Sequence, residues 1–386
     1  MLKPLSAQLI SLFVIVASVI ASAQAQTLIP ASPQLAAKSW ILIDANTGRV
    51  LVEENADLQL PPASLTKMMS SYVVAGEMAD GKFTKADKVP ISVTAWKMGG
   101  SKMFVREGTE VLLGDLLKGI IIQSGNDATV AVAEYLAGSE SAFADVMNQQ
   151  AVLLGMNSSY FMNATGWPAK GHITTARDLS LLAQALIIEH PDHYALYSEK
   201  YYEYNGIKQP NRNRLLWRDK SVDGMKTGHT EEAGYCLVAS AKRNGMRLIS
   251  VVMGTRSEEA RAQESQKLLT YGFRYFETAK VFGAGDVLQA NNRVWFGKED
   301  SVDLVLADDV FLTFPRGARA QLESNIHVDA ILEAPLTQQQ ELGRLLVTYK
   351  GDVLADKKLV AAHPIAEAGF FSRLWDRLVQ FVMSLL

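Results

Sequence analysis

The sequence predicts an α/β domain with an antiparallel sheet flanked by helices, followed by a small all-β domain and a terminal amphipathic helix. Three observations predict this class. Strand-like runs occur early and late within residues 26–279, with a long helical stretch between them. Short strands separated by turn residues fill residues 280–362, and residues 363–386 carry polar positions at helical spacing. Hydrophobic residues make up 48% of the 386 residues, so two packed cores are expected and general disorder is excluded.

The N-terminal segment has the pattern of a secretory signal peptide. Lys3 precedes an apolar run from Leu9 to Ile20, and the small residues Ala21–Ala23 follow it. The run is too short for a comfortable membrane span, and an uncleaved anchor is the alternative. We therefore expect residues 1–25 to be a signal peptide and the mature chain to lie outside the cytoplasm.

The first domain, residues 26–279, is expected to begin and end with strands. An Asn-Thr-Gly turn between two apolar runs predicts a β-hairpin, and Pro61 and Pro62 then break the chain before a helix. The expected elements are, in order, hairpin strands 39–44 and 50–52, a helix from 63 with Ser64 in its first turn, two buried helices between 112 and 136 interrupted at 124–126, a helix 179–188, neighbouring strands 237–241 and 247–253, and a helix 265–276.

The second domain and the chain end differ in character. Five short strands between residues 294 and 347 predict a small β-sandwich-like domain at 280–362. From Phe370 onward, dense Phe, Trp and Leu residues share a helix with polar residues that fall on one face. The helix is too short to span a bilayer, so we expect residues 370–386 to lie on a membrane surface. A helix docked on its own protein is the alternative.

Charge and motif content exclude several classes of function. The net charge is −3, so no basic excess is available for nucleic acid. The one cysteine, Cys236, is interpreted as buried and inert because it lies in an apolar strand. The chain has no His-Glu-x-x-His string, and His190 and His193 are interpreted as exposed turn residues, so we expect neither a metal nor a cofactor.

Three short strings carry residues suited to nucleophilic catalysis. Ser64 and Lys67 are three residues apart, which places them on one face of a helix. A serine hydroxyl needs a base to become a nucleophile, and a lysine can serve when burial and a second cation lower its pKa. The helix N-terminus adds positive potential where an oxyanion would form.

The second and third strings would complete such a site. In Ser124-Gly125-Asn126, the hydroxyl can pass a proton between base and leaving group, and the amide can donate a hydrogen bond to a peptide carbonyl. In Lys226-Thr227-Gly228, the lysine supplies a second cation, the threonine a donor for a carboxylate, and the glycine room for a substrate backbone at a strand edge. Each string is weak alone, but the three in this order form a specific pattern.

Together, the strings resemble those of the low-molecular-mass penicillin-binding proteins, specifically the membrane-anchored D-alanyl-D-alanine carboxypeptidases of the penicillin-binding protein five and six type. The resemblance runs through most of the mature chain and is strongest at 62–67, 123–127, 175–178, 211–217 and 222–235. It implies a catalytic domain like that of serine β-lactamases and DD-peptidases, a small β domain and a membrane helix at the periplasmic face of a bacterial inner membrane.

The resemblance also implies catalytic roles. Ser64 would form the acyl-enzyme, with Lys67 as general base, and Ser124 would relay protons. Lys226 would tune the electrostatics and orient Ser124. The backbone N–H groups of Ser64 and His229 would form the oxyanion hole.

Substrate binding is implied in the same way. Asn126 would hold the substrate and Thr227 would bind its terminal carboxylate, helped by Arg261, with the nearby Arg256 as the alternative. The implied substrate is a peptidoglycan stem peptide ending in D-Ala-D-Ala, and the implied covalent inhibitors are β-lactam antibiotics.

One loop departs from the family pattern. Within residues 163–168, some members carry His where this chain has Thr165 and Leu where it has Trp167. The loop helps to position the deacylation water in the family, so the departure bears on turnover more than on acylation.

Three rival functions remain open at this stage. A class A β-lactamase would need its deacylating Glu in a Glu-x-x-Leu-Asn string, which this chain lacks. A DD-endopeptidase would use the same residues on cross-links. A non-catalytic wall scaffold would have no need of both Ser64 and Lys67.

Overall fold

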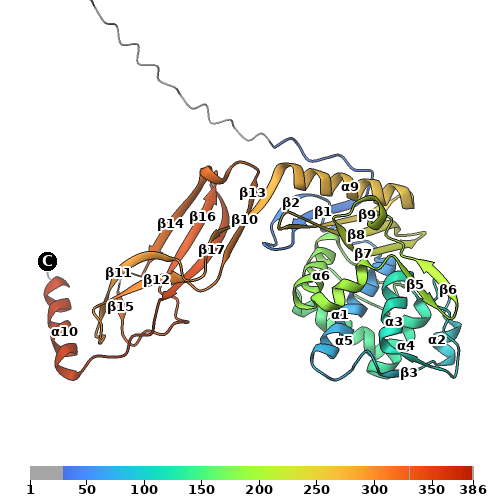
Figure 1. Ribbon diagram of the computed structural model, residues 1–386, viewed down its shortest axis with the longest axis horizontal. Coiled ribbons are helices and arrows are strands. Elements are labelled where there is room, and N and C mark those ends of the chain that lie inside the picture. Colours follow the sequence, from blue (N-terminus) through green and yellow to red (C-terminus); the bar gives the residue numbers. More distant parts are fainter. Residues whose placement is uncertain (1–28, 330, 385–386) are drawn as a thin grey trace, which may run out of the picture.

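The computed structural model describes residues 29–329 and 331–384, so the expected signal peptide at 1–25 lies outside the described residues. Figure 1 shows a body rich in helices, an elongated all-β body beside it, and a short helix at the far end. The predicted fold class is confirmed by this arrangement.

The first body is built on one antiparallel sheet with the strand order β2-β1-β9-β8-β7. The predicted hairpin and the predicted late strand pair are both present, and Asn244 and Gly245 take positive φ in the turn between the late strands. Strand β7 forms one edge of this sheet, so one side of its backbone is open to another partner. The strands are β1 (Ser39–Asp44), β2 (Val50–Glu54), β7 (Val222–Thr230), β8 (Gly234–Arg243) and β9 (Met246–Thr255).

Helices cover both faces of this sheet. Helix α9 (Glu258–Tyr275) packs on β8 and β9 from one side, and α6 (Ala176–Glu189) packs on β1 and β9 from the other. The remaining elements are β3 (Lys88–Pro90), α2 (Val93–Lys97), β4 (Glu110–Leu112), α5 (Glu140–Leu153), α7 (Pro191–Tyr194), η3 (Ala195–Ser198), β5 (Tyr201–Tyr204), β6 (Ile207–Pro210) and α8 (Leu215–Arg218).

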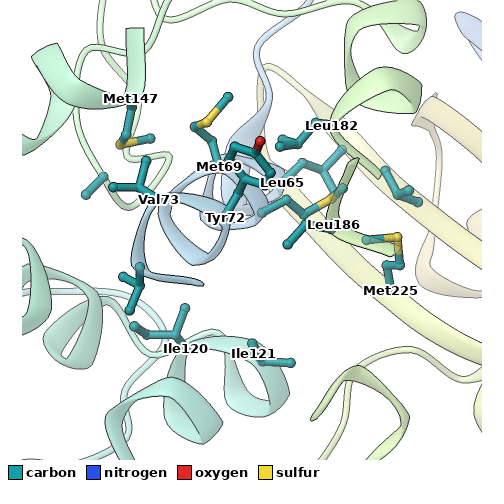
Figure 2. Packing of buried hydrophobic residues seen from close by; sticks show 14 of the residues in the cluster. Leu65, Met69, Tyr72, Val73, Ile120, Ile121, Met147, Leu182, Leu186 and Met225 are labelled. Atoms are coloured by element: carbon teal, nitrogen blue, oxygen red, sulfur yellow. The ribbon is translucent and has the colours of Figure 1, made fainter. Parts of the chain in front are cut away.

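Helix α1 (Thr66–Ala79) runs through the middle of the helical layer, and its residues 66–75 are all buried. Figure 2 shows Met69 and Val73 of this helix among side chains from other elements, including Met147, Leu182 and Ile120. Truncating a buried residue such as Met69 to Ala costs about 2–5 kcal/mol of stability. The short 3₁₀ turn η1 (Ala63–Leu65) that leads into α1 is therefore anchored by a rigid core element.

The interruption predicted at 124–126 is also present. Helix α3 (Leu113–Lys118) continues into a π-helical turn, η2 (Gly119–Gln123), and Ser124 then takes a left-handed conformation with φ +64°. Helix α4 (Asn126–Ala137) starts directly afterwards. π-Helical turns inside helices often lie at functional sites, and this one presents Ser124 at the end of a buried segment.

One sequence expectation was wrong. His193 was interpreted as an exposed turn residue, but it is only 6% exposed, and its Nε2 lies within hydrogen-bonding distance of Ser71 Oγ. Pro191 begins the short helix α7, which turns His193 inward toward α1. Cys236, in contrast, is buried as expected, and burial raises the pKa of its thiol to about 11.

The second body is all-β. A six-stranded sheet of order β14-β16-β17-β12-β11-β15 faces a two-stranded sheet of β10 and β13, and its buried apolar residues form a core of their own. Its elements are β10 (Phe276–Phe282), β11 (Val287–Trp295), β12 (Ser301–Leu306), β13 (Val310–Pro315), η4 (Arg319–Gln321), β14 (Leu322–Val328), β15 (Leu332–Glu333), β16 (Gly343–Tyr349) and β17 (Asp352–Ala361).

A polar cluster joins the two bodies. The buried carboxylate of Asp44, at the end of β1, accepts a hydrogen bond from Thr278 Oγ1 at 2.6 Å. Thr313 Oγ1 lies 2.9 Å from the Thr278 hydroxyl and 2.8 Å from that of Thr47, in the β1–β2 turn. The guanidinium of Arg49 donates to the Thr313 carbonyl. The hairpin turn thus contacts the first strand pair of the β domain.

Helix α10 (Phe370–Ser384) contacts the β domain through its polar face. Asp376 accepts a hydrogen bond from the backbone N–H of Phe296 at 2.7 Å, and Arg373 pairs with Glu367. The apolar face points away from the domain, with Phe371 83% and Trp375 66% exposed. Within the described part of the chain, no helix has the length and apolarity needed to cross a bilayer.

Candidate active site

The three strings singled out in the sequence converge on one pocket of about 210 Å³ beside the edge strand β7. It is lined by Ser64, Ser101, Ser124, Arg212, Thr227, Gly228, His229, Tyr235, Glu258 and Arg261. Six of the nine expected site residues therefore line the pocket directly. The other three, Lys67, Asn126 and Lys226, are buried just behind its wall.

The amine of Lys67 is enclosed by three oxygen atoms. Its Nζ lies 3.3 Å from Ser64 Oγ, 2.7 Å from Asn126 Oδ1 and 2.5 Å from the carbonyl of Thr165. The residue as a whole is only 1% exposed. Because Ser64 lies within the turn η1 and Lys67 in the first turn of α1, their helical spacing aims the amine at the hydroxyl.

Burial and positive charge make this lysine a base near neutral pH. Burial and, after it, the charge of Arg212 lower the pKa of Lys67 to about 7, although the carboxylates of Glu140 and Asp127 partly oppose this shift. A substantial fraction of neutral amine is therefore present at pH 7. The neutral amine can accept the proton of Ser64, which a lysine of ordinary pKa could not do.

A second serine–lysine pair faces the first across the pocket. The Nζ of Lys226 donates to Ser124 Oγ at 2.9 Å and to the Thr227 carbonyl at 3.0 Å. Burial, followed by the charge of Lys67, lowers the pKa of Lys226 well below its ordinary value. This contact is compatible with the predicted role of Lys226 in orienting Ser124, which stays a prediction.

Asn126 is turned toward Lys67. Its Oδ1 accepts from the lysine, its Nδ2 donates to the Gly99 carbonyl at 2.8 Å, and its side chain is not part of the pocket lining. The next residue, Asp127, accepts backbone N–H bonds from residues 103–105 and so holds the loop that carries Ser101. In this structure, Asn126 therefore contacts Lys67, and its contact with substrate stays a prediction.

Two glycines allow loops to approach the nucleophile closely. A Cβ on Gly228 would lie 3.0 Å from the Pro62 carbonyl, so β7 contacts the turn that carries Ser64. A Cβ on Gly166 would lie 1.8 Å from the Ala63 carbonyl, and Gly166 also has φ +82°. Gly228 was expected to make room for a substrate backbone, and the structure adds that it makes room for the nucleophile turn.

The loop that departs from the family pattern is tightly organised. Asn163 Oδ1 accepts hydrogen bonds from the backbone N–H groups of Thr165, Gly166 and Trp167. This turn aims the Thr165 carbonyl at Lys67. The indole of Trp167 lies against Gly99 and Gly100, the turn that also receives the Asn126 amide.

The far end of the pocket is cationic. Arg261 is 4% exposed, donates to the Gly228 carbonyl at 3.2 Å and lies over the ring of Tyr235, which stacks on His229. Arg256, the alternative considered from the sequence, is exposed and does not line the pocket. Arg261 and Thr227 thus both line the pocket, where a small anion could reach them.

Sequence reasoning missed Arg212 and the Thr165 carbonyl. Arg212 lies within the 211–217 passage that was noted for its family likeness, but it was given no role. A backbone carbonyl carries no residue signature, so nothing in the sequence pointed to Thr165 as a partner of Lys67.

This geometry supports acyl transfer. A serine hydroxyl lies beside a buried lysine of lowered pKa, a second hydroxyl lies beside a second lysine, and two arginines line the pocket that would receive an anionic group. Such an arrangement can activate a nucleophile, protonate a leaving group and bind a carboxylate.

Comparisons with known proteins agree with this chemistry. Residues 26–257 match the D-alanyl-D-alanine carboxypeptidase family, and residues 276–367 match the C-terminal domain of penicillin-binding protein 5. The D-alanyl-D-alanine carboxypeptidase DacA of Escherichia coli is 45% identical, over 91% of this chain and 89% of that protein.

Solved structures give the same answer. Penicillin-binding protein 5 from Haemophilus influenzae superposes with a TM-score of 0.83 and 41% identity, covering 87% of this chain and 99% of that one. Penicillin-binding protein D2 from Listeria monocytogenes, solved in an ampicillin-bound form, superposes with a TM-score of 0.58 and 30% identity over 63% of this chain and 99% of that one. The pocket, the two matched regions and these likenesses show that the chain belongs to the D-alanyl-D-alanine carboxypeptidase family.

Proposed function

We propose that the protein removes the terminal D-alanine from peptidoglycan pentapeptide stems through an acyl-enzyme on Ser64. Membership of the family supports a serine-type D-Ala-D-Ala carboxypeptidase. The observation that carries the residue assignment is the contact between Ser64 Oγ and Lys67 Nζ at 3.3 Å, with the pKa of the lysine lowered to about 7.

In acylation, Ser64 Oγ attacks the carbonyl carbon of the penultimate D-alanine while Lys67 takes the hydroxyl proton. The oxyanion is stabilised by the backbone N–H groups of Ser64 and His229. The C–N bond then breaks, and the proton that Lys67 took passes through the Ser124 hydroxyl to the leaving amine of D-alanine, which returns Lys67 to its neutral form. Lys226 orients the Ser124 hydroxyl for this transfer. The products of this step are free D-alanine and an ester on Ser64.

In deacylation, a water molecule attacks the ester and Lys67 takes its proton. The C–O bond to Ser64 breaks, and the proton returns to the serine oxygen. Asn126 and the Thr165 carbonyl hold Lys67 in position during both half-reactions.

The substrate carboxylate is placed at the cationic end of the pocket. Thr227 and Arg261 bind it, and Arg212 adds a third polar group to the pocket lining. A β-lactam presents a carboxylate and a strained amide at similar spacing, so penicillins acylate Ser64. The ampicillin-bound form of the Listeria relative supports this assignment.

The proposed division of the chain matches this role. Residues 1–25 are a signal peptide, 26–279 the catalytic domain, 280–362 the β domain and 363–386 the anchoring helix. The exported enzyme lies at the periplasmic face of the inner membrane, held there by the apolar face of α10. The exposure of Phe371 and Trp375 supports this attachment.

The first test measures D-alanine released from a peptide ending in D-Ala-D-Ala by the protein without residues 1–25 and 366–386. Wild type releases D-alanine, and Ser64→Ala releases none. Lys67→Arg also fails to label with a fluorescent penicillin, because a guanidinium stays protonated. Release by Ser64→Ala, or labelling of Lys67→Arg, overturns the assigned roles.

A different result of this test would favour a DD-endopeptidase over a carboxypeptidase. A stable penicillin adduct on Ser64 without D-alanine release indicates that acylation works without turnover on stems. Cross-linked muropeptides are then the substrate to test, since a DD-endopeptidase uses the same residues.

A further inference from the structure

A groove of about 820 Å³ separates helix α10 from the β domain, compared with about 210 Å³ for the active-site pocket. One wall is the polar side of α10, with Arg377 and Gln380. The other wall comes from β11 and the segment before β15, with Arg293, Trp295 and Ile331. The helix thus contacts the domain at its first turns and leaves space along the rest of its length.

The groove is rich in hydrogen-bond donors. The guanidinium of Arg293 lies 3.8 Å from the centre of the Trp295 ring, an arrangement that holds it in place. Within residues 29–329 and 331–384, no carboxylate lies within 4.0 Å of the charged groups of Arg293 or Arg377. Gln380 Nε2 is buried without a hydrogen-bond partner. Asp329 is the carboxylate in the lining, so two cations face one anion.

The orientation of α10 sets the height of the groove relative to a membrane. The polar face, with Arg373 and Asp376, is turned to the β domain, and the apolar face with Phe371 and Trp375 is turned away. An interfacial helix buries its apolar face at the boundary between headgroups and acyl chains. A groove on the opposite, polar side of the helix then lies at the level of the lipid headgroups.

We propose that this groove binds the headgroup of an anionic phospholipid, with the phosphodiester between Arg293 and Arg377 and the glycerol ester region along Ile331 and Phe381. Guanidinium groups form strong hydrogen bonds with phosphate oxygens. Ile331 and Phe381 are 58% and 61% exposed, which suits a ligand with an apolar part better than inorganic phosphate. This lipid site extends the proposed membrane attachment to a specific lipid class, and it rests on that attachment.

The test counts lipids retained on the chain with residues 26–386 in a neutral detergent micelle, by native mass spectrometry. Micelles carry no surface charge, so general attraction to an anionic bilayer is removed. Wild type retains one phosphatidylglycerol and little phosphatidylcholine. Arg377→Gln lowers phosphatidylglycerol retention about tenfold.

The matched control is Arg373→Gln. It removes the same charge from the same helix about one turn away, but Arg373 is paired with Glu367 and lies outside the groove lining. Its lipid retention stays at the wild-type level. Ile331→Asp, a change at an exposed position of the opposite wall, also lowers retention without touching α10.

Three outcomes overturn the proposal. In the first, wild type, Arg377→Gln and Ile331→Asp retain phosphatidylglycerol equally. In the second, wild type retains phosphatidylglycerol and phosphatidylcholine equally. In the third, millimolar inorganic phosphate displaces the lipid. Pelleting with neutral phosphatidylcholine vesicles tests the attachment separately. Retained phosphatidylglycerol in micelles without vesicle pelleting supports the groove and rejects the attachment.

Discussion

Lys67 is the side chain on which the proposed chemistry depends. Its three oxygen partners favour the protonated amine, whereas burial and the charge of Arg212 favour the neutral one. Burial is the largest of these influences, so the pKa falls to about 7. The same residue can therefore be held by hydrogen bonds and still act as a base at physiological pH.

The rate of acylation should follow the neutral fraction of Lys67. Because the neutral amine is the base, the rate is constant well above pH 7 and falls about tenfold per pH unit well below it. Stopped-flow measurement of acylation by a chromogenic β-lactam between pH 5 and 9 gives this pH–rate profile, including its acid limb. A rate that does not change across this range contradicts a lysine base.

Replacing Arg212 should shift the acid limb of the pH–rate profile. Its charge lowers the pKa of Lys67, so Arg212→Gln raises this pKa and moves the acid limb to higher pH. The control is Arg214→Gln, a nearby arginine that pairs with Glu258 and does not line the pocket. The same pH–rate profile for both variants contradicts an electrostatic role for Arg212.

Among the larger elements, the turn η1 depends on two neighbours that leave no room for a side chain. The loop around Gly166 packs against the Ala63 carbonyl, and β7 packs on the same turn through Gly228. Both contacts fix Ser64 relative to Lys67 and β7. The positions of these glycines are therefore part of the active-site geometry.

Gly166→Ala should damage catalysis far more than a matched glycine change. Its Cβ would overlap the Ala63 carbonyl, so the loop moves away and the Thr165 carbonyl leaves Lys67. We expect penicillin acylation to fall at least about tenfold, as small displacements in a catalytic site cost this much.

Gly171→Ala is the matched control. Gly171 has φ +86°, similar to Gly166, but its Cβ would meet no atom closer than Met162 Sδ at 4.0 Å. Both substitutions carry backbone strain of about 1–2 kcal/mol, and only Gly166→Ala adds the overlap. Equal acylation rates in the two variants would show that the close contact does not matter.

Across the whole molecule, the catalytic domain and α10 lie at opposite ends of the β domain (Figure 1). The polar cluster of Asp44, Thr278 and Thr313 connects the catalytic domain to the near end of the β domain. This arrangement supports a spacer role for the β domain, which would hold the active-site pocket away from the membrane and toward the peptidoglycan cell wall.

Removing residues 366–386 should separate attachment from catalysis. Helix α10 contacts the β domain near Phe296 and Glu367, and none of its residues line the active-site pocket. The truncated protein leaves the membrane pellet and releases D-alanine from a soluble peptide at the wild-type rate. Continued pelleting of the truncated protein, after signal removal, contradicts the anchor.

The sequence alone determined the fold class, the family and the enzymatic activity, and these predictions are confirmed. This was possible because the informative signals are local. Ser64 and Lys67 are one helical turn apart, the hairpin turns are read from Asn and Gly, and the amphipathic pattern of the last helix repeats every three to four residues. The roles of the individual site residues stay predictions.

Only the tertiary structure decided how these residues meet. The Thr165 carbonyl reaches Lys67 across 98 positions of sequence, and Lys226 reaches Ser124 across 102. Such contacts depend on how the helices pack on the sheet, and a carbonyl partner has no residue signature. The same packing turns Asn126 toward Lys67 and buries His193. It also decides that the polar face of α10 contacts the β domain, since a local pattern shows which face of a helix is polar but not what that face contacts.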